Sequence, residues 1–485
     1  MVGDGPPYCR HVAATSYPVV PTMTSSMPAG TTADPAPQLL VGGLSLVVLI
    51  VAILQTSVIP VLGIMTEQLR EPAVSVSWVV TANLLTAAAA TPLIGRLADL
   101  RNKKRVLLGV LSLVLAGSLL AATTSWLPLL VTGRMLQALA FALFPVAVSI
   151  IRDELPPEAL VRSISLLSAM LAFGGGFGLV TTGLLMSEGA SYHRVFWFGA
   201  AATTTALIAA WVVVPDRPHY VEEPIDWIGG AALAAGLAAL LLAITEGSRW
   251  GWTSPAILAC AVIGLGVMRW WWSRSQRCPY ALVPVAVLKR RPILLGNIAT
   301  LFVGMGLYFS FLGTTGFVEA PTGSHYGFDA SVLDASVEFL LPGALAAAVA
   351  ALLAGRYIER YGPRAVVAAG ACAGAVGFTA LAIWHTNPWQ VVVAGLFTNA
   401  YISLGYGALP VLVLQNGVAQ HETGIATSLN AIFRKVGSAI AAAMLAGVEK
   451  PAATNGVIPE TAFITIFILG AVTALAVLLL ALRRR

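Results

Sequence analysis

The chain is dominated by long apolar runs that short polar or charged segments separate. Each run is long enough to cross a membrane, which takes about 20 apolar residues for a hydrocarbon core of about 30 Å. The runs do not alternate apolar and polar positions, so they do not predict the strands of a membrane barrel. The pattern predicts fourteen transmembrane helices, at residues 39–65, 77–96, 106–123, 127–151, 163–186, 194–214, 226–245, 253–272, 293–318, 332–354, 365–384, 388–415, 423–446 and 460–482.

Basic residues fall mainly on one side of these helices. Of the 28 Lys and Arg residues, 21 lie on the side of the two termini, four lie on the other side and three lie within helices. Cytoplasmic loops of membrane proteins carry such an excess. We therefore expect both termini in the cytoplasm, and we attribute the net charge of +6 to these loops and not to a nucleic-acid partner.

Composition supports a membrane protein, because 58% of the 485 residues are apolar and 10% are charged, against about 25% charged in ordinary soluble domains. Residues 1–38 differ. They hold seven prolines and lack the basic segment and apolar run of a signal peptide, so we expect a disordered cytoplasmic tail. The four cysteines have no metal-binding spacing, and we expect neither a metal nor a cofactor.

A short motif occurs twice, 260 residues apart. Gly95-Arg96-Leu97-Ala98-Asp99 and Gly355-Arg356-Tyr357-Ile358-Glu359 share the pattern Gly-Arg-x-x-acid, and each follows a predicted helix. Parallel repeats are a transporter architecture with the substrate site between the two halves. We expect an N-terminal six-helix half at 39–214, an inserted helix pair and central cytoplasmic loop at 215–292, a C-terminal six-helix half at 293–482 and a basic cytoplasmic end at 483–485.

The segment 95–105 resembles the loop motif G-x-L-a-D-r-x-G-r-k of the major facilitator superfamily, with Asn102 in place of the usual glycine. Arg134 and Gln137 are similar to the family's R-x-x-Q, and Asn430 and Arg434 to its pattern in helix 13. Segments at both ends of the predicted helix 226–245 resemble the fourteen-helix drug:proton antiporter branch. The resemblance covers about 40–448 and implies an all-α polytopic membrane protein of the major facilitator fold. It also implies a location in the cell membrane (inner or plasma membrane).

Two features depart from that branch. Gly174, Gly178 and Gly183 match its helix 5 pattern, but Leu179 replaces a proline; the glycines are expected to allow close helix packing. Gln55 stands where the branch usually has an aspartate, and both departures count against proton antiport but not against the fold.

The resemblance further implies a gate on the cytoplasmic side. Asp99, Arg101, Lys103 and Asp153 are expected to form a charge network that latches the outward-facing state. The two repeated motifs complete the expected gate, with Gly95, Arg96, Gly355, Arg356 and Glu359.

Ionisable groups inside a bilayer are costly and indicate functional sites. Arg134 binds either backbone carbonyls or an anionic group of a substrate, and both alternatives stay open. Glu338, with Asp334 one turn earlier, is the expected proton-coupling acid, since a desolvated carboxyl group can hold a proton near neutral pH. Lys435 either snorkels or lines the cavity. The expected cavity residues are Gln55, Asn83, Arg134, Gln137, Tyr308, Asn399, Tyr401, Asn430 and Arg434.

No lysine follows a glycine, so the phosphate-binding loop of an ATPase is excluded, and we expect no enzyme. We expect a secondary transporter that exports lipophilic or cationic drug-like compounds by alternating access in exchange for protons, as a monomer in the lipid bilayer. The resemblance to the drug:proton antiporter branch also implies a role in multidrug efflux and antibiotic resistance. One alternative is a facilitator or lipid translocase without proton antiport. A non-transporting membrane sensor is a second alternative.

Overall fold

The structure is a computed structural model that describes residues 37–186, 190–217, 224, 226–278, 280–283, 285–324, 326–415, 423–452 and 458–483. Most of the expected tail lies outside these residues. Its last two positions, 37 and 38, instead belong to the first helix. Arg484 and Arg485 of the expected basic end also lie outside the described residues.

Fourteen helical segments in the described part of the chain are long and apolar enough to cross a membrane, which confirms the expected number. No strand occurs among the described residues. The spanning segments contain α1 (Pro37–Thr56), α2 (Leu62–Leu69), α4 (Trp78–Leu100), α5 (Lys103–Thr123), α6 (Leu127–Ala138), α7 (Leu143–Glu154), α8 (Pro157–Leu185), α9 (His193–Val213), α10 (Trp227–Trp250), α11 (Pro255–Ser275), α13 (Arg291–Glu319), α15 (Leu341–Tyr361), α16 (Pro363–Ile383), α17 (Pro388–Leu414), α18 (Thr423–Ala452) and α19 (Glu460–Leu482). The short helices are α3 (Ala73–Val76), α12 (Val285–Lys289) and α14 (Val332–Asp334).

Three spans contain a turn of different geometry. A 3₁₀ turn at Ile59–Val61 joins α1 to α2, where Pro60 cannot donate a backbone hydrogen bond. A second 3₁₀ turn at Leu139–Ala142 joins α6 to α7. A π-helical turn at Ala335–Leu340 precedes α15, and such turns are frequent at functional sites. The simple apolar runs of the sequence did not predict these irregularities.

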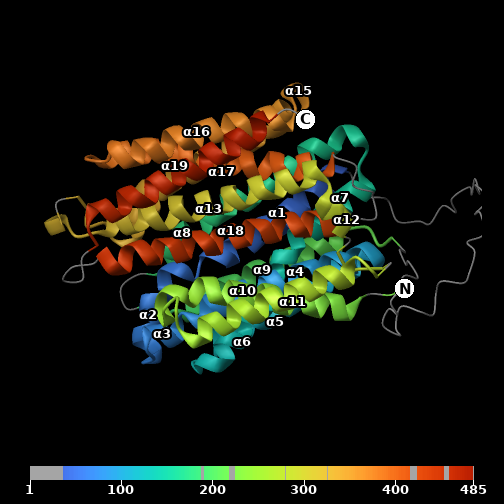
Figure 1. Cartoon of the computed structure of the whole chain (residues 1–485), viewed down its shortest axis with the longest axis horizontal. Coiled ribbons are helices and arrows are strands. Elements are labelled where there is room, and N and C mark those ends of the chain that lie inside the picture. Colours follow the sequence, from blue (N-terminus) through green and yellow to red (C-terminus); the bar gives the residue numbers. More distant parts are fainter. Residues whose placement is uncertain are drawn as a thin grey trace, which may run out of the picture.

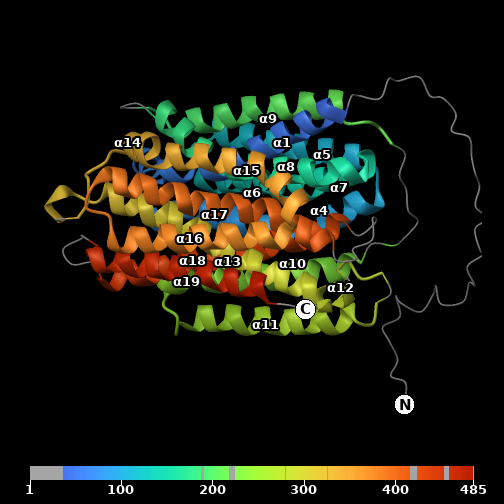
Figure 2. The same ribbon diagram turned by 90° about the horizontal axis from the view of Figure 1, so that it is seen from above.

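We call α1–α9 the N-terminal half, α10 and α11 the inserted pair, and α13–α19 the C-terminal half. The helices run roughly parallel to one long axis, and in Figure 1 the C-terminal half (yellow to red) lies largely above the N-terminal half and the inserted pair. We call the end where α19 finishes the basic end; α2, α3 and α14 lie at the opposite, far end (Figures 1 and 2).

Side-chain hydrogen bonds cap the first turns of helices α5 and α10. Asn102, at the position where the family usually has glycine, has φ −58° and accepts a hydrogen bond from the Arg105 backbone N–H at 3.0 Å. It therefore acts as an N-cap of α5, and the turn does not require the left-handed backbone for which glycine is favoured. Asp226 caps α10 in the same way, through the Gly229 N–H at 2.9 Å.

The inserted pair is attached beside the junction of the two halves. The Glu246 carboxylate of α10 is buried, accepts a hydrogen bond from Thr81 of α4 at 3.2 Å and pairs with Arg249 at 3.1 Å. Leu233 and Leu237 of α10 belong to one apolar cluster with Ile425 of α18. The pair therefore contacts α4 and α18, one helix from each half.

Candidate functional site: a cavity between the two halves

A cavity of about 470 Å³ lies where the two halves meet. From the N-terminal half, α1, α4, α6 and α8 line it, and from the C-terminal half α13, α17 and α18 do, together with the π-helical turn. Most lining side chains are apolar, such as Leu171, Leu307 and Phe311. A mainly apolar pocket with a few polar groups is the usual form of a small-molecule site. Five of the residues expected from the sequence line it: Gln55, Asn83, Arg134, Tyr308 and Arg434.

Arg134 is held by oxygen atoms of its own half. Its guanidinium donates to the carbonyl oxygens of Val79 at 3.3 Å and Leu54 at 3.4 Å, and to Gln137 Oε1 at 2.7 Å. The side chain is 2% exposed. Of the two alternatives that the sequence left open, the structure therefore shows the contacts with backbone carbonyls, which tie α6 to α1 and α4.

Arg434 has a different environment. Its guanidinium lies over the rings of Tyr406 at 4.7 Å and Phe144 at 5.6 Å. The side chain is 6% exposed, and no described residue accepts a hydrogen bond from it. Cation–π contacts compensate part of the cost of burying this charge, but they leave its N–H groups without acceptors.

Lys435, the next residue, lines the same cavity. Its Nζ donates to Gln55 Oε1 of α1 at 3.2 Å and lies 3.6 Å from the centre of the Phe141 ring. This places Lys435 in the cavity and not at the membrane surface. Its location in an apolar span was the only signal in the sequence for such a role.

The lining side chains include three cations (Arg134, Arg434 and Lys435) and, among the described residues, one carboxylate, Glu319 at the end of α13. We had expected the coupling acid to be Glu338 with Asp334. The structure places both outside the cavity: each is exposed, and Asp334 accepts a hydrogen bond from Ser331 Oγ at 2.6 Å. The residues of the π-helical turn that line the cavity are instead Ser336 and Leu340.

Four further expected cavity residues do not line it. Gln137 lies behind Arg134 and donates to Ser118 at 2.8 Å. Asn430 donates to Asn297 at 3.1 Å and to Thr300 at 2.7 Å, between α18 and α13. Tyr401 is 1% exposed, and a Cβ at Gly306 or at Gly374 would collide with its ring. Asn399 donates to the Gly395 carbonyl of its own helix at 3.0 Å. Each is a packing or helix-bridging residue, because helix contacts in a membrane also use polar side chains.

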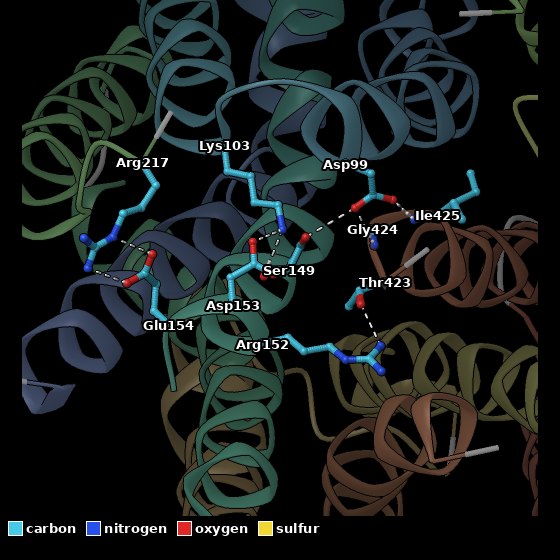
Figure 3. Close-up of polar contacts among 10 residues, drawn as sticks. All are labelled: Asp99, Lys103, Ser149, Arg152, Asp153, Glu154, Arg217, Thr423, Gly424 and Ile425. Carbon is cyan, nitrogen blue, oxygen red and sulfur yellow. Dashed lines mark hydrogen bonds and ion pairs between the residues drawn. The ribbon is translucent and has the colours of Figure 1, made fainter. Parts of the chain in front are cut away.

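Figure 3 shows the contacts that Asp99, Lys103 and Asp153 of the expected gate form. The Asp99 carboxylate accepts hydrogen bonds from the backbone N–H groups of Gly424 and Ile425, both at 3.0 Å. These two groups belong to the first turn of α18, where backbone donors have no partner within the helix. Ser149 of α7 donates to the same carboxylate at 3.3 Å. Asp99 of the N-terminal half therefore caps a helix of the C-terminal half.

The neighbouring charges form separate contacts. Lys103 pairs with Asp153, as expected, but within the N-terminal half. Arg152 donates to Thr423 across the junction at 2.6 Å, and Arg217 pairs with Glu154 at 3.3 Å (Figure 3). Arg101 lines a surface groove between α4 and α5. The sequence did not indicate the contact of Asp99 with α18, because backbone N–H groups carry no residue-specific signal.

The second copy of the motif also contacts the opposite half. Glu359 pairs with Arg162 of α8 at 2.6 Å, and Gly355 lies where a Cβ would be 3.1 Å from the Arg162 Cα. In the first copy, a Cβ at Gly95 would be 2.1 Å from Ser428 Oγ of α18. Each motif therefore pairs a small residue with an acid at the junction. Arg96 is buried and Arg356 is exposed.

The helix 5 glycines allow close approach of α8 to α1. A Cβ at Gly174 would lie 2.6 Å from the Leu49 carbonyl oxygen, and one at Gly178 would lie 2.9 Å from that of Ile53. Gly183 faces Leu333 and Ser336 of the C-terminal half at 3.4 Å or more. The proline that Leu179 replaces is therefore not needed for this close contact.

Known proteins share this sequence pattern and architecture. At the sequence level, the chain is 26% identical over 276 residues to an uncharacterized MFS-type transporter, YvkA, of Bacillus subtilis, a stretch that is 56% of this chain and 60% of the relative. It is 24% identical over 406 residues to the tetracenomycin C resistance and export protein of Streptomyces glaucescens, with 81% of this chain and 72% of the relative covered. The chain thus spans only about 60% of the length of YvkA.

The fold comparison agrees. The structure of the human organic anion transporter MFSD10 superposes with a TM-score of 0.64 at 14% identity, over 92% of this chain and 100% of that one. At this identity the likeness concerns the fold alone. The family model of the Major Facilitator Superfamily matches residues 44–442, which include both repeated motifs and the helices that line the cavity. With its fourteen spans and its cavity between two halves, the chain belongs to the Major Facilitator Superfamily of transporters.

Proposed function

We propose that this protein is a secondary transporter that exports small lipophilic compounds across the cell membrane by alternating access. The observation that carries the proposal is the combination of a mainly apolar cavity between the halves with a closed junction at the basic end, where Asp99 caps α18. Because basic residues mark the cytoplasmic side, we assign this state as closed toward the cytoplasm. The name of the tetracenomycin C export protein supports export as the direction.

Alternating access requires that the closed junction can open. The contacts at the basic end are local: two backbone hydrogen bonds to Asp99, the bond from Arg152 to Thr423 and the partly exposed pair of Arg162 with Glu359. The hydrogen bonds to Asp99 and Thr423 each contribute about 1–2 kcal/mol or less, and an exposed ion pair adds little stability. We propose that the halves rock about the cavity as these contacts break, and that a monomer in the lipid bilayer suffices.

We further propose that transport is coupled to protons, with Glu319 as the group that carries the proton. Glu319 is the carboxylate that lines the cavity among the described residues, and it lies at the end of α13, in a cavity whose lining is mainly apolar. A carboxyl group at such a place can exchange protons with the outer side when the cavity is open there. Glu338, exposed and away from the cavity, is replaced by Glu319 in this role.

A second function has its own support. Gln55 occupies the position of the usual helix 1 aspartate, and its amide cannot carry a proton. A facilitator or lipid translocase without antiport would need no carboxylate in the cavity. The two functions differ in proton flux, which is directly measurable.

The test uses purified protein in liposomes that enclose a pH-sensitive dye, under an imposed pH gradient. Rhodamine 123 and fluorescein are added in turn, and dye movement and internal pH are followed together. We expect dye movement with proton movement in the native protein, loss of proton movement in Glu319→Gln, and no change in the matched control Glu338→Gln. Dye movement without proton flux would instead establish the facilitator, and no dye movement above protein-free liposomes would contradict transport of this class of compound.

A further inference from the structure

The charges of the cavity are unbalanced, and their partners differ. Arg134 is satisfied by two carbonyl oxygens and an amide oxygen. Arg434 and Lys435 are not: no described carboxylate forms an ion pair with either of them. A charge that is removed from water is costly unless an opposite charge or hydrogen-bond acceptors compensate it. The cavity therefore holds two cations whose compensation by the protein is incomplete.

Of the two cations, Arg434 has the less complete compensation by the protein. Its side chain is 94% buried and lines the cavity, so bulk water does not surround it. A guanidinium carries five N–H donors in a fixed plane that matches the oxygens of a carboxylate or phosphate. Its guanidinium carbon lies over the rings of Tyr406 and Phe144, at 4.7 and 5.6 Å, and no described residue accepts a hydrogen bond from its N–H donors.

Lys435 adds a second charge on the side of the N-terminal half. Its ammonium has three donors, and Gln55 Oε1 is the one described acceptor, at 3.2 Å. Adjacent side chains leave a helix about 100° apart, so the two cations reach different sides of the cavity. An acid group bound by one of them therefore lies in the field of the other.

The rest of the lining determines what accompanies an acid group. Leu171, Leu179, Leu307, Phe311 and Leu340 provide an apolar wall. Such a wall favours an apolar body by the hydrophobic effect, while three lining cations disfavour a positively charged ligand. The cationic substrates expected from the sequence are therefore the least suited class.

We propose that the cavity binds acidic amphiphiles, compounds with a carboxylate, sulfonate or phosphate group on an apolar body, and that Arg434 and Lys435 bind the acidic group. This inference rests on the proposed function, of which it names the substrate class. The acid group replaces the missing acceptors of Arg434 and of Lys435. The apolar body lies against the leucine and phenylalanine side chains.

The test measures binding and does not depend on transport. Fluorescein and rhodamine 123 share a xanthene scaffold but carry opposite charge at slightly alkaline pH, and fluorescence anisotropy reports their binding to the full-length protein in phosphatidylcholine nanodiscs. We expect the native protein to bind fluorescein more tightly than rhodamine 123. Arg434→Gln and Lys435→Gln should each weaken fluorescein binding about tenfold or more, since each removes a charged hydrogen-bond donor.

The same variants provide a readout that misfolding cannot produce. If the cations exclude positive ligands, Lys435→Gln binds rhodamine 123 more tightly than the native protein does. Lys435→Arg keeps the charge and should retain fluorescein binding. Arg291→Gln, an exposed cation at the start of α13, is the matched control and should bind as the native protein does. Unchanged fluorescein affinity in both Gln variants, or tighter binding of rhodamine 123 to the native protein, would overturn the inference.

A parallel arm identifies the source of the acid. Nanodiscs that contain phosphatidylglycerol are compared with phosphatidylcholine nanodiscs; displacement of fluorescein by phosphatidylglycerol indicates a lipid headgroup, and its absence indicates a soluble organic acid. Both results presuppose the charge-dependent site. Binding that depends on Arg434 without dye transport in liposomes would leave the inference standing and contradict the proposed function. Transport of rhodamine 123 without fluorescein binding would leave the proposed function standing and contradict the inference.

Discussion

Lys435 of α18 donates a hydrogen bond to Gln55 of α1, with 3.2 Å between Nζ and Oε1. The two residues are 380 positions apart, belong to opposite halves and both line the cavity. The bond joins the halves at the site where a substrate would bind. The drug:proton antiporter branch usually has an aspartate at the position of Gln55. Because Gln55 is a neutral amide, it does not neutralise the positive charge of Lys435.

The first prediction concerns this pair. In Gln55→Asp, the new carboxylate neutralises Lys435, so fluorescein binding should weaken about tenfold and rhodamine 123 binding should strengthen. Gln55→Ala removes the hydrogen bond without adding charge and should change the affinities less. Anisotropy titrations in nanodiscs measure both. Equal affinities in Gln55→Asp and the native protein would show that Lys435 does not contribute to ligand selection.

The second prediction concerns the cap of α18. Asp99→Ala removes the acceptor of two helix-end N–H groups, which costs about 0.5–2 kcal/mol, so the junction at the basic end should open more often. Asp99→Asn keeps an acceptor and should have a smaller effect. Electron–electron distance measurements between spin labels at Arg105→Cys and Arg360→Cys, two exposed positions at this end, report the opening. A distance distribution that Asp99→Ala leaves unchanged would contradict the role as a latch.

The third prediction concerns close approach at the same junction. An alanine Cβ at Gly95 would lie 2.1 Å from Ser428 Oγ and 3.0 Å from the Gly424 carbonyl oxygen, so Gly95→Ala should destabilise this state by about 1–3 kcal/mol. At Gly109 of α5 a Cβ meets nothing within 4 Å, so Gly109→Ala is the control. The midpoint of thermal unfolding, followed by tryptophan fluorescence, should fall for the first variant only. Equal midpoints for Gly95→Ala and Gly109→Ala would show that α4 and α18 accommodate the added methyl group without loss of stability.

The fourth prediction contrasts two buried arginines. Arg134→Gln leaves the Leu54 and Val79 carbonyls without this donor, at about 1–3 kcal/mol for each group that stays unsatisfied. Its thermal midpoint and the yield of monodisperse protein should fall. Arg434→Gln removes a charge that has no described acceptor and should preserve or raise the midpoint. The reverse order of stability would contradict the assignment of Arg134 as structural and Arg434 as ligand-binding.

Several features were predictable from the sequence because they depend on local pattern. Apolar runs determine membrane spans, since every backbone polar group in lipid must be satisfied within the helix. The positions of the segments between the spans followed from the same runs, and the two copies of the Gly-Arg-x-x-acid motif marked residues that contact the opposite half. Asp99 and Glu359 do so through different partners, a helix end and an arginine.

The sequence did not predict whether each polar residue of a helix lies toward the cavity, toward a neighbouring helix or toward the exterior. Glu338 was expected to be the proton-coupling acid and is exposed outside the cavity, while Glu319, at the end of a span, lines it. Tyr401 and Asn430 were expected in the cavity and instead contact neighbouring helices. A membrane helix is apolar on its lipid face as well as on its packed face, so the sequence pattern carries little information about which face is inside.

The sequence by itself therefore determined how many helices cross the membrane, roughly where each lies along the chain and which family they belong to, because hydrophobic length and short motifs are local properties. Only the tertiary structure decided that Arg134 is bound by carbonyl oxygens, that Asp99 caps α18, and that Arg434 and Lys435 line the cavity. Those relationships join segments up to 380 residues apart. They depend on the rotation and depth of each helix, which packing between helices sets and local sequence does not.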